Sequence, residues 1–282
     1  MKKLLCSLYL LSFLASAQQI AITIDDFPFR RMGLPQEEEP EMIALLYAHL
    51  EKFDIEATGF LNAGGLRPQN ISGVEDFINK GHKMGNHTFQ HSNVDQVGAA
   101  SFIRDVDKGR EFGKPYINST FFRYPYLRRG KTLERRDSVY AHLAEKGYNI
   151  AHVSIDNDEW IYNRDYVNAR KKGLLKEMDS IANAYLAYMK EVSLKYEEDA
   201  QKLLGRSVKH ILLIHANPIN AFHLDELLQW YQDQGWEFIT LEEASKDPMY
   251  SMEGNFVTPY GWSIIDKIRQ MTKDQVSSPA DK

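Results

Sequence analysis

Segments with the pattern of buried strands alternate with helical segments along most of this chain, and this alternation limits the fold more than any other feature. The run Ile20–Ile24 is almost wholly apolar, as in a buried strand, whereas Ile43, Leu46 and Leu50 recur at helical spacing. The same analysis predicts strands at 57–61, 120–123, 149–154, 211–214 and 237–240, and helices at 41–53, 74–80, 99–112, 133–146 and 224–234. This order predicts an α/β fold with a parallel sheet, either open or closed into a barrel.

One segment, from about Asp165 to Leu204, interrupts this alternation because it has no strand pattern. Apolar residues recur there at helical spacing and form one stripe: Leu174, Met178, Ile181, Tyr185, Met189 and Val192. We expect a helical hairpin packed on the sheet. The alternative is a lid or a wall of the substrate site, because the segment directly follows a candidate site motif.

The first 17 residues have the pattern of an export signal. Lys2 and Lys3 precede an apolar stretch from Leu4 to Leu14, and Ala15-Ser16-Ala17 follows as a small-residue cleavage site. The only cysteine, Cys6, lies inside this stretch, so a mature chain starting near Gln18 would have no disulfide. We therefore expect an exported protein of a bacterial periplasm, cell surface or secretome, without a transmembrane segment after cleavage.

The remaining sequence shows no linker, so we expect one catalytic domain over 18–275 and a short frayed tail over 276–282. A net charge of -5 argues against a nucleic-acid partner, since such proteins normally carry a basic balance or stripe. The 15 tyrosines, 14 phenylalanines and 4 tryptophans suit carbohydrate recognition, although a large core uses aromatic residues equally well.

Two adjacent carboxylates, Asp25 and Asp26, end the first apolar strand. Two like charges side by side cost energy unless a cation or a proton relieves them. The pair therefore predicts a charged partner at this strand end.

Two histidines, His87 and His91, provide candidate metal ligands. Their spacing of four predicts that both imidazoles lie on one face of a helical turn, within reach of one ion. With Asp26 they would form a site of two histidines and one carboxylate, which suits a hydrolytic metal or a non-haem iron oxygenase. A hydrogen-bonded surface turn is the alternative for the pair.

Further polar residues follow later predicted strands. Arg123 is placed to hold a carboxylate, and Pro125 fixes the backbone before Tyr126, whose amide is a candidate oxyanion donor. Asp156 and His215 come after two other strands. Because active sites of α/β folds are built at the carboxyl ends of strands, we expect these groups to meet.

Taken in order, five motifs resemble the polysaccharide deacetylases of the NodB-homology type, carbohydrate esterase family 4. They are Thr23-Ile24-Asp25-Asp26, His87-Thr88-Phe89-Gln90-His91, Arg123-Tyr124-Pro125-Tyr126, Asp156 to Trp160, and Leu212 to His215. The resemblance implies an irregular (β/α) barrel, here with a helical insertion at about 165–204. It also implies one divalent metal ion, with zinc expected and cobalt, nickel, iron or manganese as alternatives.

The resemblance also implies a role for each matching residue. Asp26, His87 and His91 would be the metal ligands. Asp25 would be the general base, Arg123 its positioning partner, and His215 the general acid. The remaining roles are a backbone donor to the oxyanion at Tyr126, a carboxylate that tethers the catalytic histidine at Asp156, and an apolar wall at Trp160.

These roles imply an enzyme that removes N-acetyl groups from an acetylated glycan, such as chitin fragments, peptidoglycan or exopolysaccharide. Hydrolysis of small amides or imides and O-deacetylation of xylan are the enzymatic alternatives. A non-catalytic glycan-binding module is a third reading, which the presence of Asp25 and His215 disfavours. The motif before Trp160 departs from the family, because it has Glu159 where aspartate is usual.

Overall fold

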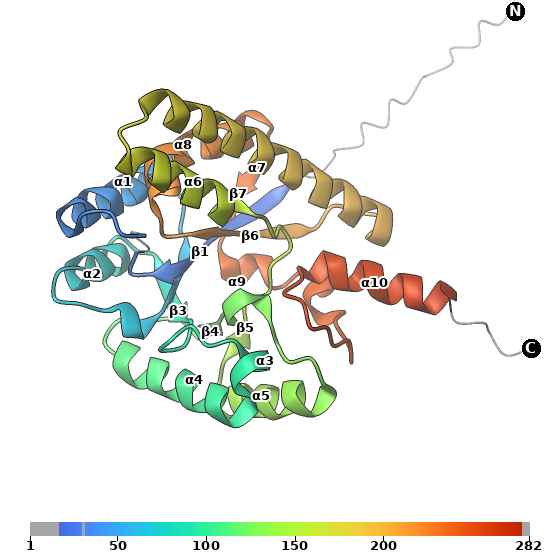
Figure 1. The fold of residues 1–282 in the computed structure, drawn as a ribbon. Helices are drawn as coiled ribbons and strands as arrows, with labels where there is room; N and C mark the ends of the chain where they lie inside the picture. The colour runs from blue at the N-terminus through green and yellow to red at the C-terminus, as the bar shows by residue number, and fades with distance from the viewer. Residues whose placement is uncertain (1–16, 30–31, 278–282) are drawn as a thin grey trace, which may run out of the picture.

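A parallel sheet forms the centre of the protein (Figure 1). The computed structural model describes residues 17–29 and 32–277. Within them, the sheet has the order β5-β4-β3-β2-β1-β6, and β7 also pairs with β1. The strands are β1 (Gln19–Phe27), β2 (Thr58–Leu61), β3 (Lys83–Asn86), β4 (Phe121–Phe122), β5 (Asn149–Ile150), β6 (Lys209–His215) and β7 (Glu237–Phe238). Strand β1 is buried along almost its whole length because strands pair with it on both edges.

The two ends of this strand order are joined beyond β5. The amides of Ser154 and Ile155 both donate to the Ile211 carbonyl at 3.1 Å, and Leu213 donates back to Ile155 at 3.3 Å. The strands therefore curl into an irregular barrel that is closed by a single bridge between Ile155 and Leu212. This architecture confirms the predicted fold class. The predicted strand 149–154 is shorter than expected because the chain leaves β5 early to reach β6.

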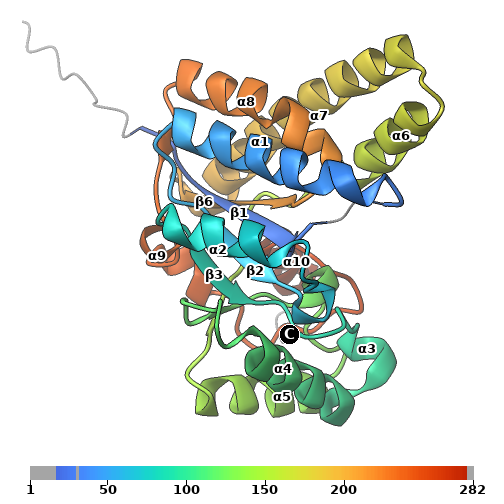
Figure 2. The same ribbon diagram turned by 90° about the vertical axis from the view of Figure 1, so that its left-hand side faces the viewer.

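Helices cover the outside of the sheet, as the alternation predicted. Figures 1 and 2 show α1 and α8 side by side against one flank, and α4 and α5 together against the other. The connecting helices are α1 (Glu39–Lys52), α2 (Ile71–Asn79), α4 (Ala99–Gly113), α5 (Leu133–Glu145) and α8 (Pro218–Asp233). Three further helices had no prediction: α3 (Val94–Val97), α9 (Leu241–Ala244) and α10 (Ile264–Ser277).

The segment from about Asp165 to Leu204 forms a helical hairpin, as predicted. It consists of α6 (Glu159–Lys171) and α7 (Leu175–Leu204), and it begins six residues earlier than expected. Met178, Tyr185 and Met189 of the apolar stripe are buried against the core, whereas Leu174 is exposed. The turn between the helices contains Gly173 at a φ of +68°, a left-handed conformation that glycine adopts without strain.

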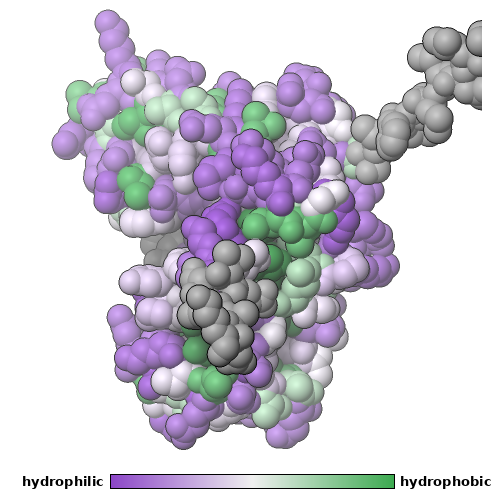
Figure 3. All heavy atoms as spheres, turned by 90° about the vertical axis from the view of Figure 1, so that its right-hand side faces the viewer, coloured by the Kyte–Doolittle hydropathy of each residue, from purple (hydrophilic) through white to green (hydrophobic). Residues whose placement is uncertain are grey.

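The surface is mixed in character. On the face that carries α10, hydrophilic residues dominate the upper part and hydrophobic residues gather at mid-height (Figure 3). No helix among the described residues has the length and apolar character needed to cross a membrane. The predicted export signal at 1–17 lies almost wholly outside the described residues. The predicted frayed tail over 276–282 lies mostly outside the described residues, in which α10 continues to Ser277.

Candidate active site

The carboxyl end of β1 delivers two acidic side chains to one cleft. Successive residues of a regular strand point to opposite faces, so adjacent side chains normally separate. Here the register of β1 against β2 shifts between Ile24 and Phe27, and Asp26 adopts a φ of +65°. As a result, Asp25 and Asp26 both line a cleft of about 840 Å³. This irregularity in β1 therefore places both carboxylates in the cleft, and β-bulges next to functional residues often redirect side chains in this way.

Arg123 forms a buried ion pair with Asp25. Its Nη1 lies 3.2 and 3.4 Å from the two carboxylate oxygens of Asp25, and its Nη2 donates to Thr23 Oγ1 at 3.0 Å. Its Nε donates to the Ala151 carbonyl at 2.8 Å, so the guanidinium is bound on every edge. Arg123 is 0% exposed, which means that its charge must be balanced by a buried partner. That partner is Asp25.

The protonation of Asp25 depends on opposing effects. Burial raises its pKa, while the charges of Arg123 and His215 lower it; burial is the larger effect. Asp26 adds a repulsive charge that raises the pKa of Asp25 further. A cation held by the neighbouring donor atoms would favour the carboxylate form, which is the form that can accept a proton.

Asp26, His87 and His91 bring three metal-ligand atoms together. One ligand atom from each residue lies within 4.8 Å of the other two. The Nε2 atom of His91 is 3.4 Å from Asp26 Oδ1, and the Nε2 atom of His87 is 3.9 Å from the same oxygen. A carboxylate with two imidazoles suits zinc and other divalent first-row metals. The residues present therefore fit the expected ion.

The orientation of His87 supports this role. Its Nδ1 lies 2.8 Å from the Arg123 carbonyl oxygen, which can only accept, so Nδ1 carries the hydrogen and Nε2 presents a lone pair. Burial lowers the pKa of His87 to about 4, although Asp26 opposes this effect. His87 is therefore neutral at neutral pH, as a metal ligand must be.

The predicted helical turn for His87 and His91 is wrong. Both residues lie in the loop after β3, where Thr88 and His91 have φ values of +67° and +57°. The loop is fixed instead by Asp105, whose carboxylate accepts from the amides of Gln90 and Ser92 at 2.9 and 3.2 Å. The imidazoles meet because the loop folds back on itself, with ring centroids 4.8 Å apart.

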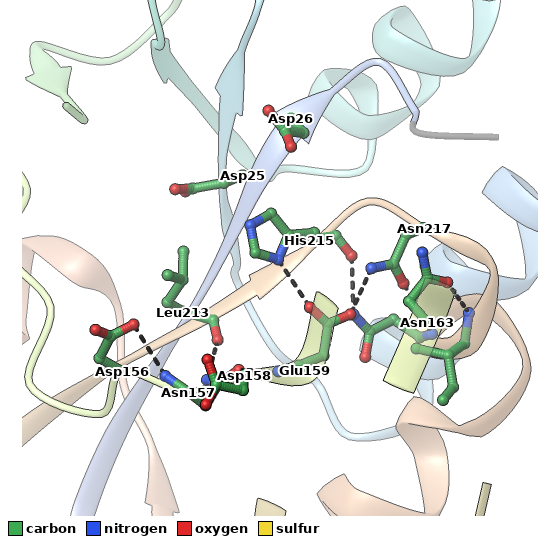
Figure 4. A network of polar contacts seen from close by, with 12 residues as sticks. Asp25, Asp26, Asp156, Asn157, Asp158, Glu159, Asn163, Leu213, His215 and Asn217 are labelled. Carbon is green, nitrogen blue, oxygen red and sulfur yellow. Dashed lines mark hydrogen bonds and ion pairs between the residues drawn. The ribbon is translucent and has the colours of Figure 1, made fainter. Parts of the chain in front are cut away.

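His215 ends β6 and lines the same cleft. Its Nδ1 lies 2.8 Å from Glu159 Oε2, and its other ring nitrogen points toward the side of Asp25 and Asp26 (Figure 4). Burial lowers the pKa of His215, but the charge and hydrogen bond of Glu159, together with Asp26 and Asp25, outweigh it and raise the pKa to about 9. His215 is therefore protonated at neutral pH.

Glu159 is itself held by a set of amide side chains (Figure 4). Its Oε1 accepts from Asn217 and, at 2.7 Å, from Asn220, and its backbone amide donates to Asn157 at 3.1 Å. Asn220 in turn accepts from the Tyr185 hydroxyl of α7 at 2.6 Å. Glu159 is fully buried, so these donors compensate its lost hydration. The inserted helix thus supports the orientation of His215.

Asp156 does not tether the histidine, contrary to the prediction. The structure places Glu159 against His215, whereas an Asp156 oxygen accepts from the following amide of Asn157 at 2.9 Å. The reason is local: Glu159 is the first residue of α6, and this turn aims it at β6. Asp156 still lines the cleft, where burial and nearby carboxylates raise its pKa to about 7. In the sequence, the only sign that Glu159 rather than Asp156 would contact His215 was the unusual glutamate before Trp160.

The rim of the cleft is aromatic. Tyr126 and Trp160 line it, and the ring centroid of Tyr126 lies 4.5 Å from that of His91. Tyr126 has a φ of +58°, so its backbone is held in a left-handed conformation. The inserted helix α7 forms another wall of the cleft. Besides packing against the core, it therefore also occupies the position of a wall, which was the alternative expectation for this segment. This wall and a distant loop add residues that the sequence did not indicate: Tyr188, Val192, Lys195, Tyr196 and Gly261.

Part of the chain matches a known protein family by sequence. Residues 15–149 match the family model described as polysaccharide deacetylase. The match includes Asp25, Asp26, His87, His91 and Arg123, and it ends before Glu159 and His215. No curated protein sequence matches the chain.

Several solved structures share the fold at low identity. A family 4 acetyl xylan esterase from Clostridium thermocellum, in complex with a cobalt ion, has a TM-score of 0.55 at 18% identity, covering 81% of this chain and 90% of its own. The peptidoglycan deacetylase PdaC from Bacillus subtilis has a TM-score of 0.53 at 16% identity, covering 93% and 98%. The family 4 pseudoenzyme BA3943 from Bacillus anthracis has a TM-score of 0.54 at 15% identity, covering 81% and 66%.

Proposed function

We infer from the sequence match over residues 15–149 that this chain carries a polysaccharide deacetylase domain, as the five motifs predicted. We propose that it is a metal-dependent hydrolase that removes N-acetyl groups from an acetylated amino-sugar polymer or oligomer. Chitin fragments, peptidoglycan and exopolysaccharide are the candidate substrates. The proposal rests on the groups that surround the cleft rather than on fold alone.

One observation carries the proposal: a candidate base and a candidate acid flank a three-donor metal site. Asp25 and His215 are register partners on β1 and β6, and both line the cleft with Asp26, His87 and His91. Each has its own positioning partner, Arg123 for Asp25 and Glu159 for His215. Two titratable groups held apart in this way have the arrangement that acid–base hydrolysis needs.

Asp26, His87 and His91 would hold the ion, and zinc is our first choice for this donor set. When bound, a divalent ion polarises the acetyl carbonyl and makes water a better nucleophile. Asp25 then accepts the proton of the attacking water, while Arg123 holds its carboxylate in place. His215 donates a proton from its ring to the departing nitrogen, which leaves poorly as an unprotonated amide.

Acetate release by the mature protein tests this proposal directly. The zinc-loaded protein would be assayed on chitooligosaccharides, peptidoglycan, exopolysaccharide fragments and acetylated xylan, with Asp25→Asn as the matched control. Release that is lost in Asp25→Asn and on chelation supports the proposal and identifies the substrate class. Zinc bound at one equivalent with no acetate released from any substrate would contradict it, and would favour a small-amide hydrolase or a binding module.

O-deacetylation of xylan is the second candidate, because the fold resembles that of an acetyl xylan esterase. An alkoxide leaves more easily than an amide nitrogen, so an esterase depends less on its acid. His215→Ala distinguishes the two reactions. Loss of about 100-fold or more in kcat on the best substrate supports an amide, whereas a loss of only a few-fold supports an ester.

We also propose that the protein is exported, on the basis of the signal pattern in residues 1–17. An extracellular or periplasmic position would bring the enzyme to glycan polymers. Cell fractionation with an antibody, together with the N-terminal sequence of the mature protein, tests this point. A mature chain that starts near Gln18 is the expected result, and a full-length protein in the cytoplasm would contradict it.

A further inference from the structure

Three aromatic rings are stacked in the loop before α10, and none of them belongs to the proposed catalytic or metal-binding residues. The ring of Trp262 lies between those of Phe256 and Tyr260, at centroid distances of 6.0 and 5.5 Å and interplanar angles of 18° and 16°. Near-parallel, offset rings at these distances are a favourable aromatic arrangement. Tyr260 ends the stack and is 57% exposed, although large aromatic side chains are usually covered.

This stack directly adjoins the rim of the cleft. Gly261, between the two stacked residues Tyr260 and Trp262, lines the cleft itself. A Cβ atom on Gly261 would lie 1.8 Å from the Tyr126 carbonyl oxygen, so the loop contacts the backbone of Tyr126 as closely as the chain allows. Arg128 donates to the Pro259 carbonyl and ties the same two segments together. The exposed side chains of Tyr126 and Tyr260, at 55% and 57%, thus lie on two segments that are in direct contact.

We propose that Tyr260, supported by Trp262, is a stacking platform for the sugar rings of a glycan chain that extends out of the cleft past Tyr126. This inference rests on the proposed function and narrows its substrate to a chain of several pyranose residues rather than a single sugar or small amide. A pyranose ring has a face of C–H groups, and a flat aromatic surface buries that face while the hydroxyl groups stay in water.

The details of the stack favour a bound chain over a purely structural role. A ring that only filled the core would be covered, whereas Tyr260 keeps most of its surface in solvent. Trp262 and Phe256 hold it rigid, which lowers the entropy lost when a ligand binds. The platform lies in the loop over 252–263, which the family model over residues 15–149 does not include.

Binding measured without turnover tests the platform separately from catalysis. Zinc-loaded Asp25→Asn protein would be titrated by calorimetry with N-acetylglucosamine dimer and hexamer and with xylohexaose. The Tyr260→Ala substitution would then be added to the same background. We expect at least one hexamer to bind more tightly than the dimer, and Tyr260→Ala to weaken its binding by roughly 3- to 10-fold.

Two matched variants control for indirect effects. Tyr260→Phe keeps the ring and should retain hexamer binding. Leu175→Ala removes an apolar side chain that is 70% exposed at the start of α7, outside the cleft lining, and should change nothing. Hexamer binding that is equal to dimer binding, or is unaffected by Tyr260→Ala, would overturn the platform even if the wild type releases acetate. Conversely, absence of acetate release with Tyr260-dependent hexamer binding would refute the proposed reaction and keep the platform.

Discussion

Asp25 lies opposite His215 in the register of the neighbouring parallel strands β1 and β6. The pairing runs without interruption from Gln19 opposite Lys209 to this pair, and the Ala216 amide donates to the Asp25 carbonyl at 2.9 Å just beyond it. The proposed base and acid are therefore placed by one strand pair. The residues that orient them come from elsewhere, Arg123 from the end of β4 and Glu159 from the start of α6. Substitutions at Arg123 and Glu159 test these two orienting roles.

Replacing Glu159 with glutamine should move the alkaline limit of activity to lower pH. Glu159 raises the pKa of His215 to about 9, and a general acid works only while it is protonated. Without the negative charge, the pKa of His215 falls toward its ordinary value near 6.5, so less of it is protonated at pH 8. We expect kcat at pH 8 to fall by roughly 10-fold or more, with a smaller loss at pH 6.

The pH profile of Asp156→Asn provides the matched control for Glu159→Gln. Asp156 makes no hydrogen bond to His215 in the structure, so its removal should move the alkaline limit less than removal of the Glu159 charge does. Glu159→Asp should restore part of the profile if the shorter side chain still reaches the ring. An alkaline limit that moves with Asp156 and not with Glu159 would restore the original assignment of the tether.

Replacing Arg123 with methionine should impair both folding and catalysis. The substitution leaves the Asp25 carboxyl buried without its ion-pair partner and leaves Thr23 and Ala151 without their donor. Breaking one side of a buried ion pair costs about 3–5 kcal/mol, so the melting temperature should fall by several degrees. Asp25→Asn with Arg123→Met should recover part of the lost stability, since no carboxyl is then left unpaired. Full stability in the single Arg123→Met variant would contradict this account.

Adding zinc should stabilise the protein through Asp26, His87 and His91. A ligand that binds only the folded state raises the free energy of unfolding by about 2.7 kcal/mol at 100 times its dissociation constant. We expect a clear rise in melting temperature on adding zinc to metal-free protein, lost in His91→Ala. His142→Ala serves as the control, because that imidazole pairs with Asp107 at 2.8 Å away from the cleft. An equal rise in His91→Ala would place the ion elsewhere.

Replacing Gly261 with alanine should reduce activity on every substrate, long or short. The new methyl group would meet the Tyr126 carbonyl oxygen at 1.8 Å, so either the loop or the Tyr126 backbone must move. Since Tyr126 lines the cleft beside His91, we expect kcat to fall by roughly 10-fold. Gly254→Ala, in the same loop with open space around its Cβ but a φ of +53° that strains alanine, controls for backbone strain in the loop without the contact to Tyr126. Wild-type kcat in Gly261→Ala would show that Tyr126 needs no fixed position.

The sequence by itself determined the alternation of strands and helices, except for β3 and the helices α3, α9 and α10, and the kinds of side chain at the strand ends. Apolar periodicity is a local property, so the run at Ile20–Ile24 and the stripe that includes Met178 and Met189 could be read directly. The motifs also predicted the resemblance to polysaccharide deacetylases that the match over residues 15–149 supports, because residue types in a fixed order do not depend on knowing the contacts. Local patterns therefore predicted an α/β fold with a parallel sheet, and the motifs predicted some of the residues that line its cleft, among them Asp25, Asp26 and His215.

Only the tertiary structure decided which of these residues act together. Asp156 and Glu159 are both acidic and three positions apart, and the start of α6 alone determines which one reaches His215. His87 and His91 meet through a folded-back loop rather than the helical turn that their spacing indicated. Gly261 meets Tyr126 across 135 positions of sequence, from 126 to 261. Such contacts depend on how loops and helices pack around the barrel, and no local pattern of residues specifies that packing.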